Sequence, residues 1–214
     1  MGTVTPEGLH NYTTALQAYN LVGGPVVFDP VGAGATAVRR SAVKTLMASG
    51  YFDVIKGNEG EIKTVFGSLV QQRGVDSGAS TLSNTEKATL TRDLAVRERN
   101  VVVMTGAVDF VSDGSRTFAI SNGPELLGEI TGSGCVLGTA ISLMLAVCRG
   151  DKLLAAIAGL LHYEIAAEVA AAREDVRGPG TFVPALIDEL YNIQKLTSGG
   201  DASWLDKSKV EAVL

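Results

Sequence analysis

A single cysteine interrupts a run of small residues in the stretch ITGSGCVLGTA (130–140), where its position suggests chemistry. Gly132, Ser133 and Gly134 lead into an expected helix whose first turn holds Cys135. Backbone N–H groups at a helix N-terminus, together with the helix dipole, form a binding site for an anion. The electric field at a helix N-terminus also increases the reactivity of a cysteine placed there. We therefore expect the backbone of this loop to bind an anion.

The alternative for a free cysteine is burial as a small apolar side chain. Cys148 fits that alternative because it ends the apolar stretch VLGTAISLMLAVC (136–148), which we interpret as a buried core helix. Cys135 fits it less well, since it directly follows small polar and glycine residues. The two cysteines form no CxxC motif, so neither a disulfide framework nor a zinc site is indicated. Both are expected to be reduced thiols in a cytosolic protein.

Two acidic residues lie where a magnesium ion could be held. Asp29 ends the apolar run PVVFD (25–29), and Glu61 lies in KGNEGEI (56–62). Mg²⁺ in nucleotide sites is bound by one or two carboxylates and keeps several waters. Asn58 and Glu61 also have the spacing of a helix N-cap and its N3 residue, so a capping box explains both without any ligand. The spacing leaves both interpretations open.

Three further segments offer candidate phosphate contacts. Glycines in DPVGAGAT (29–36) let the backbone approach a ligand, and the N–H groups of Gly32 and Gly34 are expected to face phosphate. Lys56 is expected to reach a nucleotide phosphate as a point charge, the alternative being a solvated surface lysine. Thr105 ends an apolar run, and a plain strand exit into a hairpin explains it without a ligand.

Short β-type runs alternate with longer helical segments, which predicts βαβ units and a mostly parallel sheet. Two β-type runs joined by Asp113-Gly114 predict a two-residue hairpin. In such sheets ligands bind beyond the carboxyl ends of the strands. A surface loop is expected at 69–84. Strands are expected at 25–29, 53–56 and 100–105, and helices at 3–23 with Thr5 as N-cap, 36–49, 57–67, 85–99, 135–148, 151–174 and up to 195.

The composition narrows the class of protein. The chain has 214 residues, which fits one α/β domain with a short appendage. Its 18 basic residues are outnumbered by 23 acidic ones, so no general attraction to nucleic acid or to an anionic membrane is expected. We see no signal peptide and no apolar run of transmembrane length. These features favour a cytoplasmic protein.

Taken together, six segments resemble the hydroxyethylthiazole kinases, which belong to the ribokinase-like superfamily. They are MGTVTPE, PVVFDPVGAGAT, IKGNEGEI, VVVMTG, ITGSGC and RGPGTF, in the family's order and spanning most of residues 1–195. The resemblance implies a three-layer α/β/α fold and ATP-dependent phosphorylation, with Mg²⁺, of the primary alcohol of 4-methyl-5-(2-hydroxyethyl)thiazole in thiamine biosynthesis. It also implies a homotrimer with sites between subunits.

The resemblance assigns a role to each candidate residue. Asp29 and Glu61 would organise Mg²⁺, and Cys135 would face the acceptor hydroxyl, in the place where many sugar kinases carry an aspartate base. The remaining assignments are Lys56, Asn58, Thr105, Gly132, Ser133 and Gly134 for ATP, and Gly2, Gly132 and Cys135 for the thiazole.

The chain also departs from the family pattern. Lys56 stands where the family usually has arginine, which removes a bidentate phosphate contact. The resemblance begins well inside the family domain, so residues 1–196 are interpreted as a kinase domain lacking its N-terminal segment. Residues 197–214 are interpreted as a flexible link and C-terminal tail. In fungi this kinase follows a thiamine-phosphate synthase domain, and the chain is compatible with the kinase part of such a fusion.

Two other functions stay open from the sequence. One is a ribokinase-like kinase for another small alcohol such as a hydroxymethylpyrimidine. The residues of the acceptor pocket would distinguish such a kinase from a thiazole kinase. The other is an inactive fragment that binds nucleotide or serves in assembly.

Overall fold

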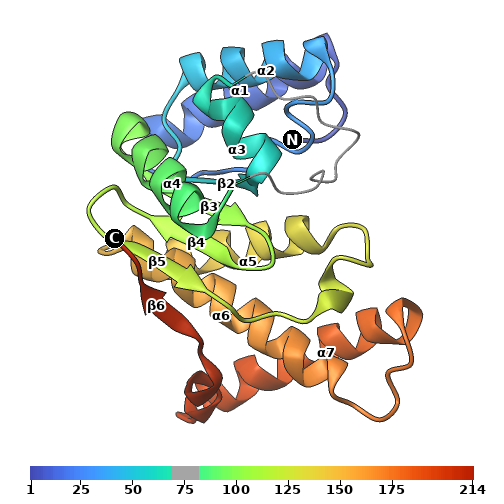
Figure 1. Ribbon diagram of the computed structural model, residues 1–214. Helices are drawn as coiled ribbons and strands as arrows, with labels where there is room; N and C mark the ends of the chain where they lie inside the picture. The colour runs from blue at the N-terminus through green and yellow to red at the C-terminus, as the bar shows by residue number, and fades with distance from the viewer. Residues whose placement is uncertain (69–81) are drawn as a thin grey trace.

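The computed structural model describes residues 1–68 and 82–214, so most of the loop expected at 69–84 lies outside the described residues. Within these ranges, six strands form one sheet in the order β1-β2-β3-β4-β5-β6 (Figure 1). The strands are β1 (Val27–Phe28), β2 (Val54–Asn58), β3 (Val101–Thr105), β4 (Asp109–Ser112), β5 (Thr117–Ile120) and β6 (Val210–Ala212).

The sheet is mixed rather than mostly parallel. Strands β1, β2 and β3 run parallel to one another. Strands β4, β5 and β6 each pair antiparallel with the strand before them in the order. For β4 and β5 the reason lies in the connections, because short turns join antiparallel neighbours whereas parallel strands need a crossover. The α/β class and the β-hairpin are confirmed.

The hairpin turn is longer than the predicted two residues. Strands β4 and β5 are separated by residues 113–116. The Oδ1 atom of Asp113 accepts hydrogen bonds from the backbone N–H groups of Ser115 and Arg116, at 2.9 and 2.8 Å. An aspartate that binds the backbone two and three residues ahead stabilises a wider turn than the Asp-Gly pair alone requires.

Helices cover both faces of the sheet, which confirms the three layers (Figure 1). Val101 and Val103 of β3 belong to the apolar core on one face of the sheet, while Val102 and Met104 belong to the apolar core on the other face. The helices match the expected ranges closely, and Thr5 caps the first as predicted. They are α1 (Pro6–Leu21), α2 (Ala37–Ser49), α3 (Glu59–Phe66), α4 (Asn84–Glu98), α5 (Ser133–Val147), α6 (Lys152–Ala171) and α7 (Pro179–Ser198), with short 3₁₀ helices η1 (Glu125–Leu127) and η2 (Ser203–Lys207).

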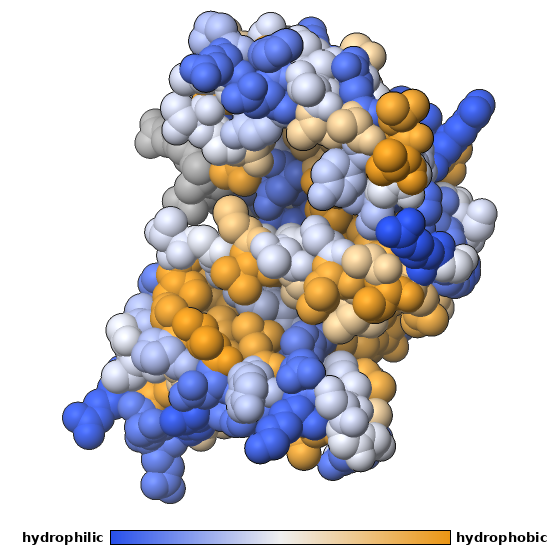
Figure 2. Space-filling model, turned by 180° about the vertical axis from the view of Figure 1, so that it is seen from behind, coloured by the Kyte–Doolittle hydropathy of each residue, from blue (hydrophilic) through white to orange (hydrophobic). Residues whose placement is uncertain are grey.

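Helix α5 is only half buried, which corrects its interpretation as a buried core helix. Ile141 and Leu145 are buried, but Leu143 and Val147 are 60% and 75% exposed. The reason is that α5 packs against α6 and the short strand β1 and leaves its other side uncovered. Figure 2 shows hydrophobic side chains at the surface of the face seen from behind.

Helix α6 is the longest apolar helix among the described residues that could be compared with a membrane span. By length and composition alone it is apolar enough to cross a membrane, although 72% of its most apolar window is buried inside the protein. Glu164 and Glu168 interrupt its apolar residues, which is why no continuous run appears in the sequence. Its burial is that of a core helix.

The C-terminal residues continue the fold. Strand β6 pairs with β5 and so forms one edge of the sheet. Asn122 fastens this segment, since its side chain donates to the carbonyl oxygen of Lys207 at 3.0 Å and accepts from the backbone N–H of Lys209 at 2.8 Å. Trp204 packs against the core beneath α6. The segment expected to be a flexible link and tail at 197–214 therefore contributes a strand to the sheet.

Candidate active site

The carboxyl ends of three parallel strands meet the beginning of α5 at one end of the molecule. Asp29 directly follows β1, Asn58 ends β2, and Thr105 ends β3, where it lies opposite Asn58 in the register. A hydrogen bond between Lys56 of β2 and the carbonyl oxygen of Gly134 joins the sheet to the first turn of α5. This is where ligands bind in open α/β sheets.

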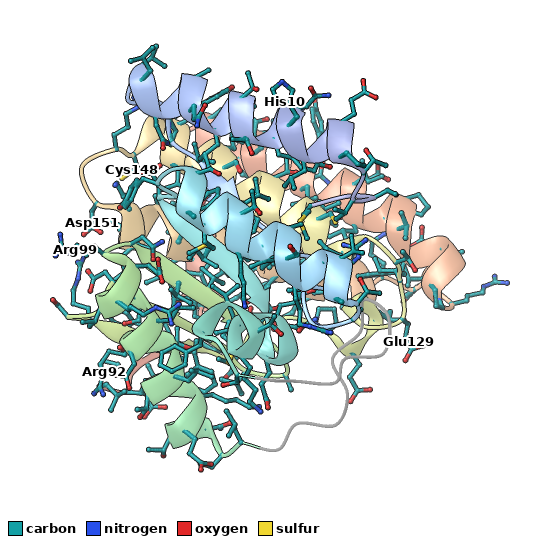
Figure 3. The ribbon with its side chains drawn as sticks, turned by 90° about the horizontal axis from the view of Figure 1, so that it is seen from above. His10, Arg92, Arg99, Glu129, Cys148 and Asp151 are labelled. Atoms are coloured by element: carbon teal, nitrogen blue, oxygen red, sulfur yellow. The ribbon has the colours of Figure 1, made fainter. Side chains whose placement is uncertain are left out.

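The opposite end of α5 lies far from this region. In Figure 3, Glu129, which precedes the glycine-rich loop, lies at one end of the molecule, while Cys148 and Asp151 lie at the other. The two cysteines of the chain are therefore separated by the length of the helix. The candidate site includes Cys135 but not Cys148.

Lys56 is the central contact of the site. Its Nζ atom lies 2.8 Å from Asp29 Oδ2 and 2.9 Å from the carbonyl oxygen of Gly134. The residue is only 4% exposed, so the alternative of a solvated surface lysine is wrong. A Cβ atom on Gly134 would lie 3.0 Å from Lys56 Nζ, and one on Gly138 would lie 3.7 Å from Asp29 Oδ2. Sequence reasoning missed Gly138, although its spacing of four from Gly134 places both on one helix face.

Asp29 carries an unsatisfied oxygen. Its Oδ1 atom is buried and has no hydrogen-bond partner among the described residues. A buried anionic oxygen without a partner is costly, and a cation removes that cost. No group of three or more His, Cys, Asp or Glu side chains within residues 1–68 and 82–214 forms a metal cage. Mg²⁺ needs no such cage when nucleotide phosphates and water complete its shell, so Asp29 fits this ion.

Glu61 joins two backbone segments. Its Oε2 atom accepts the N–H of Asn58 at 2.8 Å, and Asn58 Oδ1 accepts the N–H of Glu61 at 3.0 Å, which confirms the capping box. Its Oε1 atom accepts the N–H of Gly32 at 2.7 Å. The prediction that this glycine N–H faces a phosphate is therefore wrong, because a buried carboxylate needs donors. Burial raises the pKa of Glu61, and the two backbone N–H groups oppose that rise.

The first turn of α5 is open to a ligand. Gly132 is the N-cap with φ of 95°, a left-handed conformation that favours glycine. Because the N-cap residue is a glycine, no N-cap side chain accepts a hydrogen bond from the N–H groups of this turn. The first N–H groups of any α-helix lack acceptors within the helix. Ser133 and Gly134 are partly buried and Cys135 is exposed, so the cysteine is not a core residue.

Cys148 is less buried than predicted. It is the C-cap of α5 and only partly covered. Its Sγ atom lies 3.9 Å from the carbonyl oxygen of Asp151. The exposed side of α5 explains the difference, because the last turn of the helix is not fully covered by the neighbouring helix.

The first residues of the chain lie beside the site. The amino nitrogen of Met1 donates a hydrogen bond to the carbonyl oxygen of Asp29 at 2.6 Å; burial lowers the pKa of this amino group, and the charge of Asp29 opposes that fall. Gly2 follows, and its N–H points to the hydroxyl of Tyr12 at 3.3 Å. Gly2 is therefore one residue away from the contact with Asp29, and its own contact is with Tyr12.

Two arginines of α2 brace the loop that follows β1. The Nη1 atom of Arg39 donates to the carbonyl oxygen of Val31 at 2.6 Å, and that of Arg40 donates to Gly34 at 2.8 Å. Sequence reasoning did not single out these arginines. Their signal was a pair of cations directly after a glycine-rich loop, at the start of a helix.

Comparison with known proteins agrees with the motifs. The model of the hydroxyethylthiazole kinase family matches residues 1–196. The chain is 43% identical over 211 residues to a probable thiamine biosynthetic bifunctional enzyme of Schizosaccharomyces pombe, covering 96% of this chain and 40% of the relative. It is 40% identical over 193 residues to a hydroxyethylthiazole kinase of Roseiflexus castenholzii, covering 90% of this chain and 69% of the relative.

Solved structures agree as well. The hydroxyethylthiazole kinase protein of Pyrococcus horikoshii has a TM-score of 0.82 and 35% identity, covering 100% of this chain and 75% of that chain. Pyridoxal kinase of Staphylococcus aureus has a TM-score of 0.54 and 18% identity, covering 74% and 56%, and supports the expected ribokinase-like fold alone. The chain thus spans 40% of the fungal relative's length and more of the prokaryotic ones. With residues 1–196 matched, the chain belongs to the hydroxyethylthiazole kinase family.

Proposed function

We propose that this chain carries the phosphoryl-transfer site of a kinase for the primary alcohol of 4-methyl-5-(2-hydroxyethyl)thiazole, with ATP as co-substrate, in thiamine biosynthesis. The observation that carries the proposal is the bridge from Asp29 through Lys56 to the open first turn of α5. Enzymatic phosphoryl transfer depends mainly on positioning and on stabilising charge. This region brings together a carboxylate, an ammonium group and helix N–H groups, which can position the phosphates and stabilise their charge.

The phosphates of ATP would lie between the strand ends and the first turn of α5. Asn58 and Thr105 lie side by side at the ends of β2 and β3, where they would contact the nucleotide. An ammonium group has three N–H donors, and Asp29 and Gly134 take two of those of Lys56. The third donor is left for a phosphate oxygen. The N–H groups at Gly132, Ser133 and Gly134 would stabilise charge on the transferred group.

Asp29 and Glu61 would contribute differently to binding Mg²⁺. Asp29 Oδ1 is buried without a partner, which makes it the protein oxygen that suits direct contact. Both oxygens of Glu61 already accept backbone N–H groups, so it would act through water. When bound, Mg²⁺ would neutralise charge on the phosphates of ATP.

The acceptor alcohol would lie next to Cys135. Its hydroxyl oxygen attacks the γ-phosphorus, the bond from that phosphorus to the bridging oxygen of ADP breaks, and the hydroxyl proton passes to the cysteine sulfur, which accepts it as a thiolate and becomes a thiol. The sulfur is exposed at the first turn of α5. Gly132 and Gly2 would border the thiazole ring. A thiol is a modest base, so most of the rate is expected from positioning.

The test is ATP turnover by the 214-residue chain with magnesium, with and without hydroxyethylthiazole. A hydroxymethylpyrimidine serves as the control acceptor, and Asp29→Asn as the control variant. ADP formation that depends on the thiazole and is lost in Asp29→Asn supports the proposal. Turnover with the pyrimidine alone would assign a different acceptor. ATP binding without any turnover would indicate a nucleotide-binding part that needs further segments for catalysis.

We also propose the organisation that the family resemblance implies. Residues 1–196 form the kinase domain, 197–214 form a C-terminal tail whose strand β6 extends the sheet of that domain, and the chain assembles as a cytoplasmic homotrimer without a nucleic-acid or membrane partner. The end of the family match at residue 196 supports the boundary. A formal charge of −5 supports the absence of an anionic partner.

A further inference from the structure

Two buried carboxyl groups lie between the sheet and α6, outside the residues assigned above. Asp109 is the first residue of β4, Glu164 lies in the middle of α6, and both are 4% exposed. Their carboxyl groups lie within hydrogen-bonding reach of each other. An ionised carboxylate can only accept hydrogen bonds, so a bond between two carboxyl groups requires that one carries a proton.

Asp109 connects this pair to the strand that ends at the site. Its Oδ1 atom accepts the backbone N–H of Gly106 at 2.8 Å. That bond closes the short turn between β3 and β4, and the turn directly follows Thr105. The position of Asp109 therefore sets the direction in which the chain leaves Thr105, which is the residue proposed to contact ATP.

Glu164 connects the pair to a second loop. A Cβ atom on Gly123 would lie 3.6 Å from Glu164 Cγ, so this loop lies directly over the glutamate stem. The backbone N–H of Gly123 also donates to Glu168 Oε1 at 3.0 Å, one helical turn further along α6. The segment that contains Gly123 leads towards the glycine-rich loop before α5. Helix α6 thus contacts both loops that approach the site.

We propose that Asp109 and Glu164 share one proton and act as positioning residues, holding the turn after Thr105 against α6 so that Thr105 faces the nucleotide. This inference rests on the proposed function. Neither residue is among those proposed to contact ATP or the alcohol, so the pair would act through Thr105 and the backbone of Gly106. The Oε2 atom of Glu164 has no partner among the described residues, which is consistent with a neutral acid.

The surrounding charges place the proton on the glutamate. Burial and then the neighbouring charge of Asp109 raise the pKa of Glu164 to about 12, and Glu168 adds to the rise. Burial also raises the pKa of Asp109, whereas the hydrogen bond from Glu164 and the charge of Lys56 on β2 oppose that rise. Tyr163 is the other titratable group beside Glu164. Asp109 is therefore the partner that carries the negative charge.

The shared proton is tested by infrared spectroscopy at neutral pH. The unmodified chain should show the carbonyl band of a buried, protonated carboxyl group. Glu164→Gln should lose this band, because its amide donates to Asp109 without an acidic proton. The matched control is Glu168→Gln, one turn further along α6, which should keep the band. A band that persists in Glu164→Gln, or one that is absent from the unmodified chain, would overturn the shared proton.

The positioning role is tested by comparing Glu164→Gln with Glu164→Leu, which leaves Asp109 without a donor. Hydrogen exchange of the Gly106 amide should be faster in Glu164→Leu and unchanged in Glu164→Gln. The Kd for Mg-ATP should rise roughly tenfold in Glu164→Leu, as expected for about one lost hydrogen bond, and stay close to the original in Glu164→Gln. Equal Gly106 exchange in all three proteins would overturn the positioning role. An unmodified chain that binds no ATP would contradict the proposed function instead. The infrared and hydrogen-exchange measurements would still test the shared proton and the positioning role, because neither needs ATP.

Discussion

At the scale of single residues, the ion pair between Lys56 and Asp29 is the contact on which the site most depends. Lys56→Met would leave the carboxylate of Asp29, whose side chain is 16% exposed, without its partner. Removing one partner of a buried ion pair typically costs about 3 kcal/mol or more of the free energy of unfolding. We expect a loss of that size in urea unfolding. Lys56→Arg is the control, because it keeps a cation beside Asp29. Equal stability of Lys56→Met and the unmodified chain would contradict the central role of this pair.

Cys135 is expected to aid the reaction without being indispensable. Cys135→Ala should reduce kcat by roughly 10²-fold, the lower end for loss of a general base, because positioning and N–H groups persist. Steady-state kinetics with hydroxyethylthiazole measures this effect. Cys148→Ala, at the far end of α5, should leave kcat unchanged. Activity at background level in Cys135→Ala would show that the thiol contributes more than this chemistry predicts.

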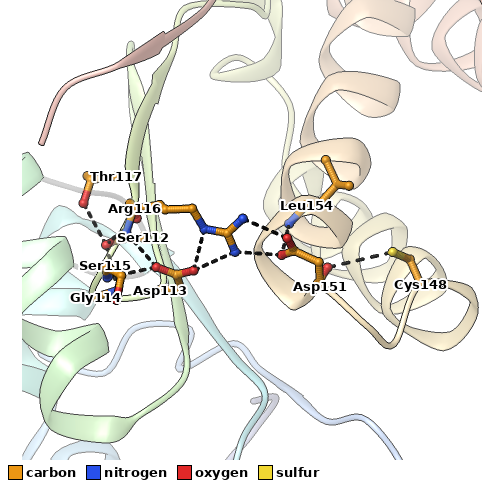
Figure 4. Close-up of polar contacts among 9 residues, drawn as sticks. All are labelled: Ser112, Asp113, Gly114, Ser115, Arg116, Thr117, Cys148, Asp151 and Leu154. Carbon is orange, nitrogen blue, oxygen red and sulfur yellow. Dashed lines mark hydrogen bonds and ion pairs between the residues drawn. The ribbon is translucent and has the colours of Figure 1, made fainter.

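At the scale of elements, an arginine joins the β4–β5 hairpin to the beginning of α6. Figure 4 shows Arg116 between two carboxylates, with ion pairs of 2.7 Å to Asp113 and 2.8 Å to Asp151. Asp151 is also the N-cap of α6, since its Oδ1 atom accepts the N–H of Leu154 at 3.0 Å. The hairpin is thereby held to the end of the molecule opposite the candidate site.

This contact predicts a specific pH dependence of stability. The hydrogen bond from Arg116 lowers the pKa of Asp151 from its ordinary value of 3.8 to about 2. A lowered pKa stabilises the folded state above 3.8, and that contribution is lost as the pH falls to about 2. Asp151→Asn keeps the cap but carries no charge. The stability difference between the two proteins, below about 1 kcal/mol for this partly exposed pair, should vanish on acidification. Urea unfolding across this range measures it, and a difference independent of pH would contradict the prediction.

At the scale of the whole molecule, the uncovered side of α5 bears on assembly. Leu143 and Val147 expose apolar surface that a second subunit would cover. Light scattering should give three times the mass of one chain. Leu143→Glu should lower that mass while leaving the circular dichroism spectrum unchanged. Leu196→Glu on α7 is the matched control, since that leucine is also exposed. A monomer at every concentration would refute the proposed trimer.

The sequence by itself determined those features that depend on neighbouring residues. Thr5 caps α1, and Asn58 and Glu61 form a capping box, because these bonds span only a few residues. Alternating strands and helices indicated the α/β class, and the order of the motifs indicated the family. The exposure of Cys135 also followed from its immediate neighbours, which are small and polar.

Only the tertiary structure decided which groups meet across the chain. Lys56 bonds to residues 27 and 78 positions away, and Glu61 accepts from Gly32, 29 positions away. Neither pairing has a local signal. The half-exposed side of α5 and the buried pair of Asp109 and Glu164 likewise depend on how helices pack on the sheet. Segments that are distant in sequence determine which residues are buried and which groups they contact. A buried charge is stable only when it is paired, and its partner comes from whichever segment packs beside it.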